Sequence, residues 1–217
     1  MQLHYLVREP HDKKTTNPVL ILLHGYGSNE QDLFSFASEL PGDYYVISVR
    51  APYDLMYGSY AWYAINFDAD ENKFSDIGQA QQSRDFIADF IDEILQTYPI
   101  DPKQVTLIGF SQGCILSYAV AVSYPEKVQR VVAMSGYFNA EIAIEGFAEN
   151  DLKQLQIFAS HGSVDQVVPV EWARKAAPLL ESLGVQIEYK EYPVGHGVAP
   201  QNFFDFRCHI NSIAPNP

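Results

Sequence analysis

Short, uninterrupted runs of apolar residues alternate along this chain with longer segments that are apolar on one side only. The run at 19–23 reads Val-Leu-Ile-Leu-Leu, with no polar residue inside it. Such a run is typical of a strand that is buried on both faces of a sheet. The expected strands are 3–8, 19–24, 44–50, 105–110, 130–135, 155–160 and 186–192, and several of them are continuously apolar in this way.

The segments between these strands predict helices. Residues 79–98 place apolar side chains three or four positions apart, which makes a single apolar stripe along one helix face. Four further helices are expected at 30–40, 112–123, 170–183 and 201–210. Strands that alternate with helices predict the α/β class, here a mostly parallel sheet of about seven strands with helices on both faces.

The chain shows no internal repeat, low-complexity tract or linker-like run that would mark a domain boundary. Its 217 residues are therefore expected to form a single domain over 1–217. One connection is unusually long and rich in aromatic residues, at about 51–77. Because connections in compact domains are mostly about 4 to 6 residues long, this segment is expected to be a loop or lid that covers the core or a ligand pocket.

The charge balance excludes some partners. Lys and Arg number 14 against 27 Asp and Glu, a net charge of −13, so nucleic acid is not an expected partner. No secretory leader is visible, and the apolar run at 19–23 is far shorter than the roughly 18 residues of a membrane span. We expect a cytoplasmic protein without integral membrane association, whose Cys114 and Cys208 are buried, reduced thiols.

The strongest chemical signal is Gly109-Phe110-Ser111-Gln112-Gly113, a G-x-S-x-G pattern between an expected strand and an expected helix. A strand-to-helix turn of this kind strains the serine backbone, and the two flanking glycines relieve the steric clash. The Ser111 hydroxyl should then be exposed at the carboxyl end of the sheet, above a helix N-terminus that favours a developing negative charge. Ser111 is the candidate nucleophile.

A serine nucleophile needs a base within hydrogen-bond reach and an acid that orients the base. In chains with this turn, the acid and then the histidine follow the serine in sequence. Asp165 lies just after the expected strand 155–160, and His196 lies between two glycines after 186–192. Asp165 is therefore the candidate acid and His196 the candidate base.

The other histidines are weaker candidates. His4 and His11 lie near the N-terminus, and His209 lies inside an expected helix. His161 is close to Asp165 but precedes it, so we interpret it as a structural residue that is hydrogen-bonded at a strand end.

The segment His24-Gly25-Tyr26-Gly27 follows the second expected strand. Its two glycines permit a turn that would aim the Tyr26 N–H at the nucleophile, where it pairs with the N–H of Gln112. These two amides are the candidate oxyanion hole. An ordinary glycine-rich strand exit is the alternative.

These motifs together resemble the phospholipase/carboxylesterase family, the α/β-hydrolases that include acyl-protein thioesterases. The resemblance covers roughly 19–206, and it rests on the oxyanion turn, the Phe-Ser-Gln elbow, the Asp165 segment that ends in Val-Val-Pro, and Gly195-His196. It implies Ser111 as nucleophile, Asp165 as acid and His196 as base, with oxyanion donors at Tyr26 and Gln112. It implies no cofactor and no metal.

The sequence departs from the family pattern at three places. Cys114 replaces a second glycine after the elbow, Tyr26 replaces a leucine in the oxyanion turn, and the segment at 61–64 lacks the acid of the family's Trp-aromatic-Asp sequence. A pattern at 68–72 imitates the start of a calcium loop. Lys73 stands where that loop requires a glycine, and Gln79 stands where it requires the closing glutamate. No metal site is expected.

We expect a serine hydrolase that cleaves carboxylic esters or thioesters of small molecules through an acyl-enzyme. Met56, Trp62, Tyr63 and Val167 are the expected substrate-binding residues. The bulk of the aromatic side chains favours short to medium acyl chains. The alternative is a catalytically inert hydrolase-fold protein that binds a ligand. The oligomeric state, and whether 51–77 is a mobile lid, a fixed pocket wall or ordinary core packing, are left open.

Overall fold

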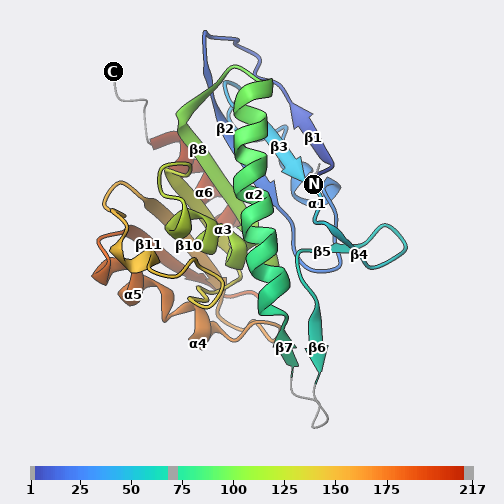
Figure 1. Ribbon diagram of the computed structural model, residues 1–217, viewed down its shortest axis with the longest axis vertical. Helices are drawn as coiled ribbons and strands as arrows, with labels where there is room; N and C mark the ends of the chain where they lie inside the picture. Colours follow the sequence, from blue (N-terminus) through green and yellow to red (C-terminus); the bar gives the residue numbers. More distant parts are fainter. Residues whose placement is uncertain (1–2, 68–72, 213–217) are drawn as a thin grey trace.

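A seven-stranded sheet runs through the computed structural model, which describes residues 3–67 and 73–212 (Figure 1). The first strand is antiparallel to its neighbour, and the other six are parallel, so their carboxyl ends meet at one edge of the sheet. All seven expected strands are confirmed. In spatial order they are β1 (Tyr5–Arg8), β3 (Tyr45–Val49), β2 (Asn17–Leu23), β8 (Ile100–Phe110), β9 (Arg130–Met134), β10 (Gln156–Gly162) and β11 (Gln186–Tyr192).

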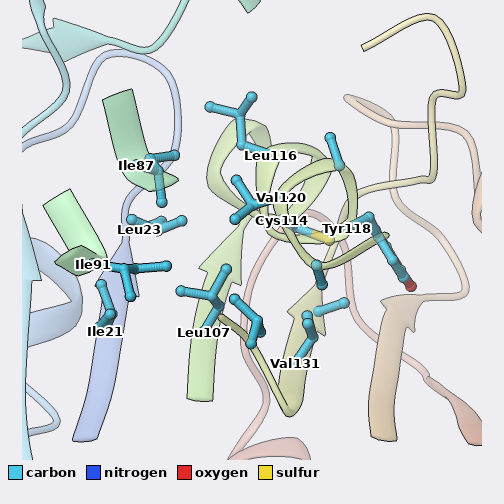
Figure 2. Packing of buried hydrophobic residues seen from close by; sticks show 14 of the residues in the cluster. Ile21, Leu23, Ile87, Ile91, Leu107, Cys114, Leu116, Tyr118, Val120 and Val131 are labelled. Atoms are coloured by element: carbon cyan, nitrogen blue, oxygen red, sulfur yellow. The ribbon is translucent and has the colours of Figure 1, made fainter. Parts of the chain in front are cut away.

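Successive residues of β2 enter two different cores, because side chains alternate between the faces of a strand. Ile21 and Leu23 pack in the cluster that also contains Ile87 of α2 (Ile77–Thr97), as Figure 2 shows. The helix α3 (Gln112–Ser123) contributes to the same cluster. Leu20 and Leu22 pack in the opposite cluster, with residues of α1 (Gln31–Phe34) and α6 (Pro200–Ser212). The uninterrupted apolar run thus corresponds to a strand covered by helices on both faces.

The helix predicted at 170–183 is divided into α4 (Val170–Ala173) and α5 (Ala176–Ser182), so that prediction is wrong in its continuity. Pro178 explains the break. It has no N–H to donate to the carbonyl four residues earlier, at Arg174, and its ring would clash with that carbonyl. Pro178 is instead in the first turn of α5, where a proline is tolerated.

The helix predicted at 30–40 is also shorter than expected, since only Gln31–Phe34 is α-helical. In the turns that follow, main-chain N–H groups donate to carbonyls three residues earlier, as from Ala37 to Phe34 at 2.9 Å. The guanidinium of Arg8 donates to the carbonyls of Ala37 and Leu40, both at 3.1 Å. These carbonyls are satisfied from outside the segment, so a continuous helix is not needed to pair them.

The long connection after β3 consists largely of two hairpins. The first is β4 (Tyr53–Asp54) with β5 (Tyr60–Ala61), and the second is β6 (Ile65–Phe67) with β7 (Lys73–Ser75). The calcium-like pattern at 68–72 lies outside the described residues. A short 3-10 helix, η1 (Phe147–Glu149), follows β9. Across the described ranges, no helix has the length and apolar character that crossing a bilayer would require.

Candidate active site

Ser111 occupies the sharp turn between β8 and α3, near the middle of the sheet. Its backbone has φ 52° and ψ −113°, a positive-φ conformation that is strained for a residue with a side chain. The flanking glycines allow the close approach that this turn needs. A Cβ at Gly113 would collide with the carbonyl of Leu23 in β2, and a Cβ at Gly109 would collide with the carbonyl of Gly113. The predicted elbow is therefore present.

The imidazole of His196 lies between Ser111 and Asp165. Its Nε2 is 3.0 Å from Ser111 Oγ, and its Nδ1 is 2.7 Å from Asp165 Oδ2. Asp165 follows β10 and His196 follows β11, so both are brought to the edge of the sheet where β8 ends. A proton on Nδ1 that is donated to the carboxylate leaves Nε2 free to accept from the serine hydroxyl. The structure brings together the three residues that the sequence singled out.

The carboxylate of Asp165 is held on both of its oxygens, and its side chain has no exposed surface. Oδ1 accepts the N–H groups of Val167 at 2.8 Å and of Val168 at 3.0 Å. Burial by itself raises the pKa of this carboxyl, but the hydrogen bonds from the two amides and from His196 outweigh it. The pKa of Asp165 is therefore lower than its ordinary value. The carboxylate is ionised at neutral pH and can stabilise a positive His196.

Gly162, the last residue of β10, lets the loop that carries His196 approach the loop that carries Asp165. A Cβ at Gly162 would collide with the carbonyls of Val194 and Gly195. The two loops are also joined by a hydrogen bond of 3.2 Å from the Val164 N–H to the Val194 carbonyl. This close contact sets the position of the base relative to the acid.

The candidate oxyanion donors border the nucleophile. A Cβ at Gly25 would be 3.3 Å from Ser111 Cβ, which places the Tyr26 turn against the elbow. Gly27 has φ 77°, a conformation that glycine adopts without strain. Within residues 3–67 and 73–212, no acceptor is in hydrogen-bond range of the Tyr26 N–H or the Gln112 N–H. Tyr26 and Gln112 therefore remain the candidate oxyanion donors.

The side chain of Gln112 connects the elbow to the aromatic segment, a role that the sequence analysis missed. Its Oε1 accepts the Trp62 N–H at 2.9 Å, and its Nε2 donates to the Tyr63 carbonyl at 2.7 Å. The hydroxyl of Ser83 on α2 donates to the Trp62 carbonyl. A glutamine can pair with both polar groups of a peptide backbone, but nothing in the sequence shows which backbone it will meet.

A cavity of about 600 Å³ adjoins Ser111 and His196. Of the four residues expected to bind substrate, Tyr63 and Val167 line it. Most of its wall was not anticipated from the sequence. The lining residues are Tyr26, Tyr63, Ile65, Ser75, Ile77, Ser111, Gln112, Ile115, Tyr137, Asn139, Glu141, Val167, Val168, Trp172 and His196.

Met56 and Trp62 do not line this cavity, which corrects the expectation that they do. Met56 is 65% exposed at the tip of the first hairpin. Trp62 is fully buried, and its indole Nε1 donates to the carbonyl of His24. An aromatic residue near a site can face the core, the cavity or solvent, and the polar Nε1 of Trp62 finds its partner inside the protein.

In the part of the chain that the structure describes, no group of three or more His, Cys, Asp or Glu side chains could hold a metal ion. The buried thiol of Cys114 has a pKa raised by burial, which disfavours the thiolate. Cys208 is exposed on α6, so the expectation that both thiols are buried is wrong for this one.

The mostly parallel sheet, the helices on both faces and the serine at a strand-to-helix turn define an α/β-hydrolase fold. Solved structures agree, although sequence identity is low. A Bacillus cereus carboxylesterase superimposes with a TM-score of 0.83 at 20% identity, covering 97% of this chain and 94% of that one. The esterase PE8 gives 0.81 at 21% identity, covering 99% and 100%.

The family model described as Phospholipase/Carboxylesterase matches residues 4–214, and the chain belongs to that family. A protein of Arabidopsis thaliana named probable carboxylesterase SOBER1-like is 35% identical over 46% of this chain and 38% of its own length. Acyl-protein thioesterase 1 of Kluyveromyces lactis is 30% identical over 56% of this chain and 53% of its own. The chain thus spans about half or less of these two curated relatives.

Proposed function

We propose that the protein is a serine hydrolase that cleaves carboxylic esters or thioesters through an acyl-enzyme on Ser111. The observation that carries this proposal is the continuous contact from Ser111 Oγ to His196 and from His196 to Asp165, at 3.0 and 2.7 Å. Such contacts are what a weakly nucleophilic hydroxyl requires for activation. Family membership and the names of the relatives support the same class of reaction.

In the acylation step, Ser111 Oγ bonds to the carbonyl carbon of the substrate while its proton passes to His196 Nε2. The carbonyl π electrons move to oxygen, and the resulting oxyanion accepts hydrogen bonds from the amides of Tyr26 and Gln112. When the intermediate collapses, the bond to the alkoxide or thiolate breaks, and His196 gives the proton to that leaving group. Each amide that donates to the oxyanion contributes a factor of about 10² to 10³ to the rate.

In the deacylation step, His196 removes a proton from water while the water oxygen bonds to the acyl carbon. The second oxyanion occupies the same pair of amides. Its collapse breaks the bond to Ser111 Oγ, which recovers the proton from His196, and the carboxylic acid leaves. Asp165 stays ionised throughout and stabilises the imidazolium that forms in both steps.

The cavity next to Ser111 is the proposed substrate site. Its volume of about 600 Å³ is within the range of small-molecule pockets. Isoleucine and valine side chains give it apolar walls, while Asn139 and Glu141 add polar groups. Tyr63 and Val167 are proposed to contact the substrate here. A cavity of this size favours acyl groups of short to medium length.

A fluorophosphonate probe tests the proposal, because it phosphonylates only an activated serine. We expect the wild-type protein to be labelled, and Ser111→Ala to be unlabelled. Ser163→Ala, which changes an exposed serine close to Asp165, is the matched control and should be labelled like the wild type. Hydrolysis of p-nitrophenyl esters and of an acyl thioester should follow the labelling.

The competing hypothesis, an inert hydrolase-fold protein that binds a ligand, predicts a different result. Such a protein would bind ligands in the cavity without being labelled. A folded wild-type protein that neither reacts with the probe nor hydrolyses any ester would favour it over the proposed function.

A further inference from the structure

A second histidine, His161, lies in contact with the proposed catalytic acid. It is near the end of β10, and neither its side chain nor that of Asp165 has exposed surface. Its Nε2 is 2.9 Å from the Val168 carbonyl and 3.3 Å from Asp165 Oδ2. It does not line the cavity, so it has no contact with a substrate bound there.

The contacts of His161 define its tautomer. A carbonyl oxygen only accepts hydrogen bonds, so the Nε2 that faces Val168 must carry a proton. Nδ1 is buried, and among the residues that the structure describes it has neither a donor nor an acceptor in range. A second proton there would be a buried donor without an acceptor, which is costly. The geometry therefore favours a neutral ring that is protonated on Nε2.

The Nε2–H of His161 contacts Asp165 in two ways, indirectly through Val168 and directly at one carboxylate oxygen. The Val168 carbonyl accepts from His161, while the Val168 N–H donates to Asp165 Oδ1 at 3.0 Å. His161 thus fixes the peptide segment that holds one carboxylate oxygen. It also presents its N–H dipole to the other oxygen, Oδ2, which accepts from His196.

A neutral donor suits this position for an electrostatic reason. Asp165 is shielded from water, so its oxygens must be satisfied by protein groups. A lysine or arginine would satisfy them too, but its charge would oppose the positive charge that His196 gains during the reaction. A neutral imidazole supplies a donor without that repulsion.

We propose that His161 is a positioning residue, which holds the carboxylate of Asp165 in the orientation that His196 requires. The inference rests on the proposed function, since it assigns His161 a role in the same reaction. His161 acts through Asp165 and not on the substrate, so its loss lowers kcat and leaves KM nearly unchanged.

The test compares two substitutions that carry the same amide group. The amide nitrogen of His161→Gln can replace Nε2, whereas that of His161→Asn is one methylene shorter and falls near Nδ1. We expect His161→Gln to stay within about threefold of the wild-type kcat. His161→Asn should lose about tenfold to a hundredfold in kcat, the rate equivalent of one hydrogen bond to a charged group, with KM within about twofold. Equal kcat losses in both variants would overturn the proposal.

A double-mutant cycle with Asp165→Asn separates positioning from a general effect on the fold. If His161 acts through Asp165, His161→Asn should cost little further activity once the carboxylate is gone. An unchanged additional loss in that background would show that the two residues act independently. Single-turnover rates, corrected for the fraction of folded protein measured by circular dichroism, provide the readout.

Nitrogen NMR of the wild-type protein needs no variant, and so stands if His161→Asn does not fold. We expect His161 to be neutral with its proton on Nε2, and a strongly deshielded Nδ1 proton on His196. A proton on Nδ1 of His161 contradicts the proposal. If instead the wild-type protein shows the expected tautomer but is neither labelled nor active, the proposed function fails and not the geometry of His161.

Discussion

The indole Nε1 of Trp62 donates a hydrogen bond of 2.9 Å to the main-chain carbonyl of His24, the residue at the start of the oxyanion turn. The main-chain N–H of the same tryptophan is bound by the side chain of Gln112 at 2.9 Å. Trp62 therefore joins the two segments that carry the proposed oxyanion donors. Its buried position serves the geometry of the site and not contact with substrate.

Trp62→Phe should lower kcat by about tenfold without changing the preference for acyl chain length. Phenylalanine keeps most of the buried area but leaves the His24 carbonyl without its donor, a loss of about 1 to 3 kcal/mol in stability. Kinetics on esters of increasing chain length, together with thermal unfolding, measure both effects. Met56→Ala is the control and should change neither, since Met56 is exposed and away from the cavity. A shifted chain-length optimum in Trp62→Phe would contradict this view.

Substitutions in the triad should each be severe. We expect Ser111→Ala and His196→Ala to lower kcat by about 10⁴ or more with the fold intact, because triad members act as a unit. Asp165→Asn should do comparable damage, since an amide at that position favours the wrong tautomer of His196. Asp151→Asn, the same change at an exposed site, is the control for steady-state kinetics. Near-normal turnover of Asp165→Asn would show that the acid is assigned wrongly.

The ion pair of Glu30 with Arg50 predicts a pH-dependent stability. Glu30 is buried, and Arg50 donates to it at 2.5 and 2.7 Å. The hydrogen bonds from Arg50 lower the pKa of Glu30 despite its burial. A carboxyl whose pKa is lower in the folded state stabilises the fold above its unfolded pKa of about 4.3, and the stabilisation disappears as the pH falls through the folded value.

Glu30→Gln should therefore be less stable than the wild type by about 2 kcal/mol at pH 7, and this difference should shrink as the pH falls from 5 to 3. Urea unfolding at a series of pH values measures it. Glu145→Gln, at an exposed position, is the matched control and should show little difference at any pH. A deficit of Glu30→Gln that is constant down to pH 3 would exclude the predicted linkage.

Ile115 provides a test of the cavity as the acyl site. It lies in α3, on the turn after Ser111, and lines the cavity while it is almost fully buried. Each CH₂ that an acyl chain buries is worth about 0.8 kcal/mol, or roughly fourfold in kcat/KM until the cavity is full. Ile115→Ala should move the optimum to longer chains by about two carbons. The control is Val122→Ala on the same helix, which removes a buried side chain outside the cavity and should leave the optimum in place.

Much of the fold and the triad could be predicted from the sequence. The central strands β2 and β3 were recognisable because a strand buried on both faces must be largely apolar, and the elbow because its turn needs glycine at two fixed offsets from the serine. The order serine, acid, histidine is typical of chains with this elbow, and the positions of Asp165 and His196 just after expected parallel strands predicted that they meet Ser111 at one edge of the sheet. Local pattern and topology were sufficient for the residues that the structure brings together.

The direction in which individual side chains point was decided by the tertiary structure. Trp62 and Tyr63 are adjacent and both aromatic, yet one donates to His24 in the core and the other lines the cavity. The rest of the cavity wall includes Tyr137 and Trp172, which the fold brings together from segments after β9 and β10. A side chain's partner depends on distances between elements remote in sequence, and the periodicity of a single segment contains no information about them.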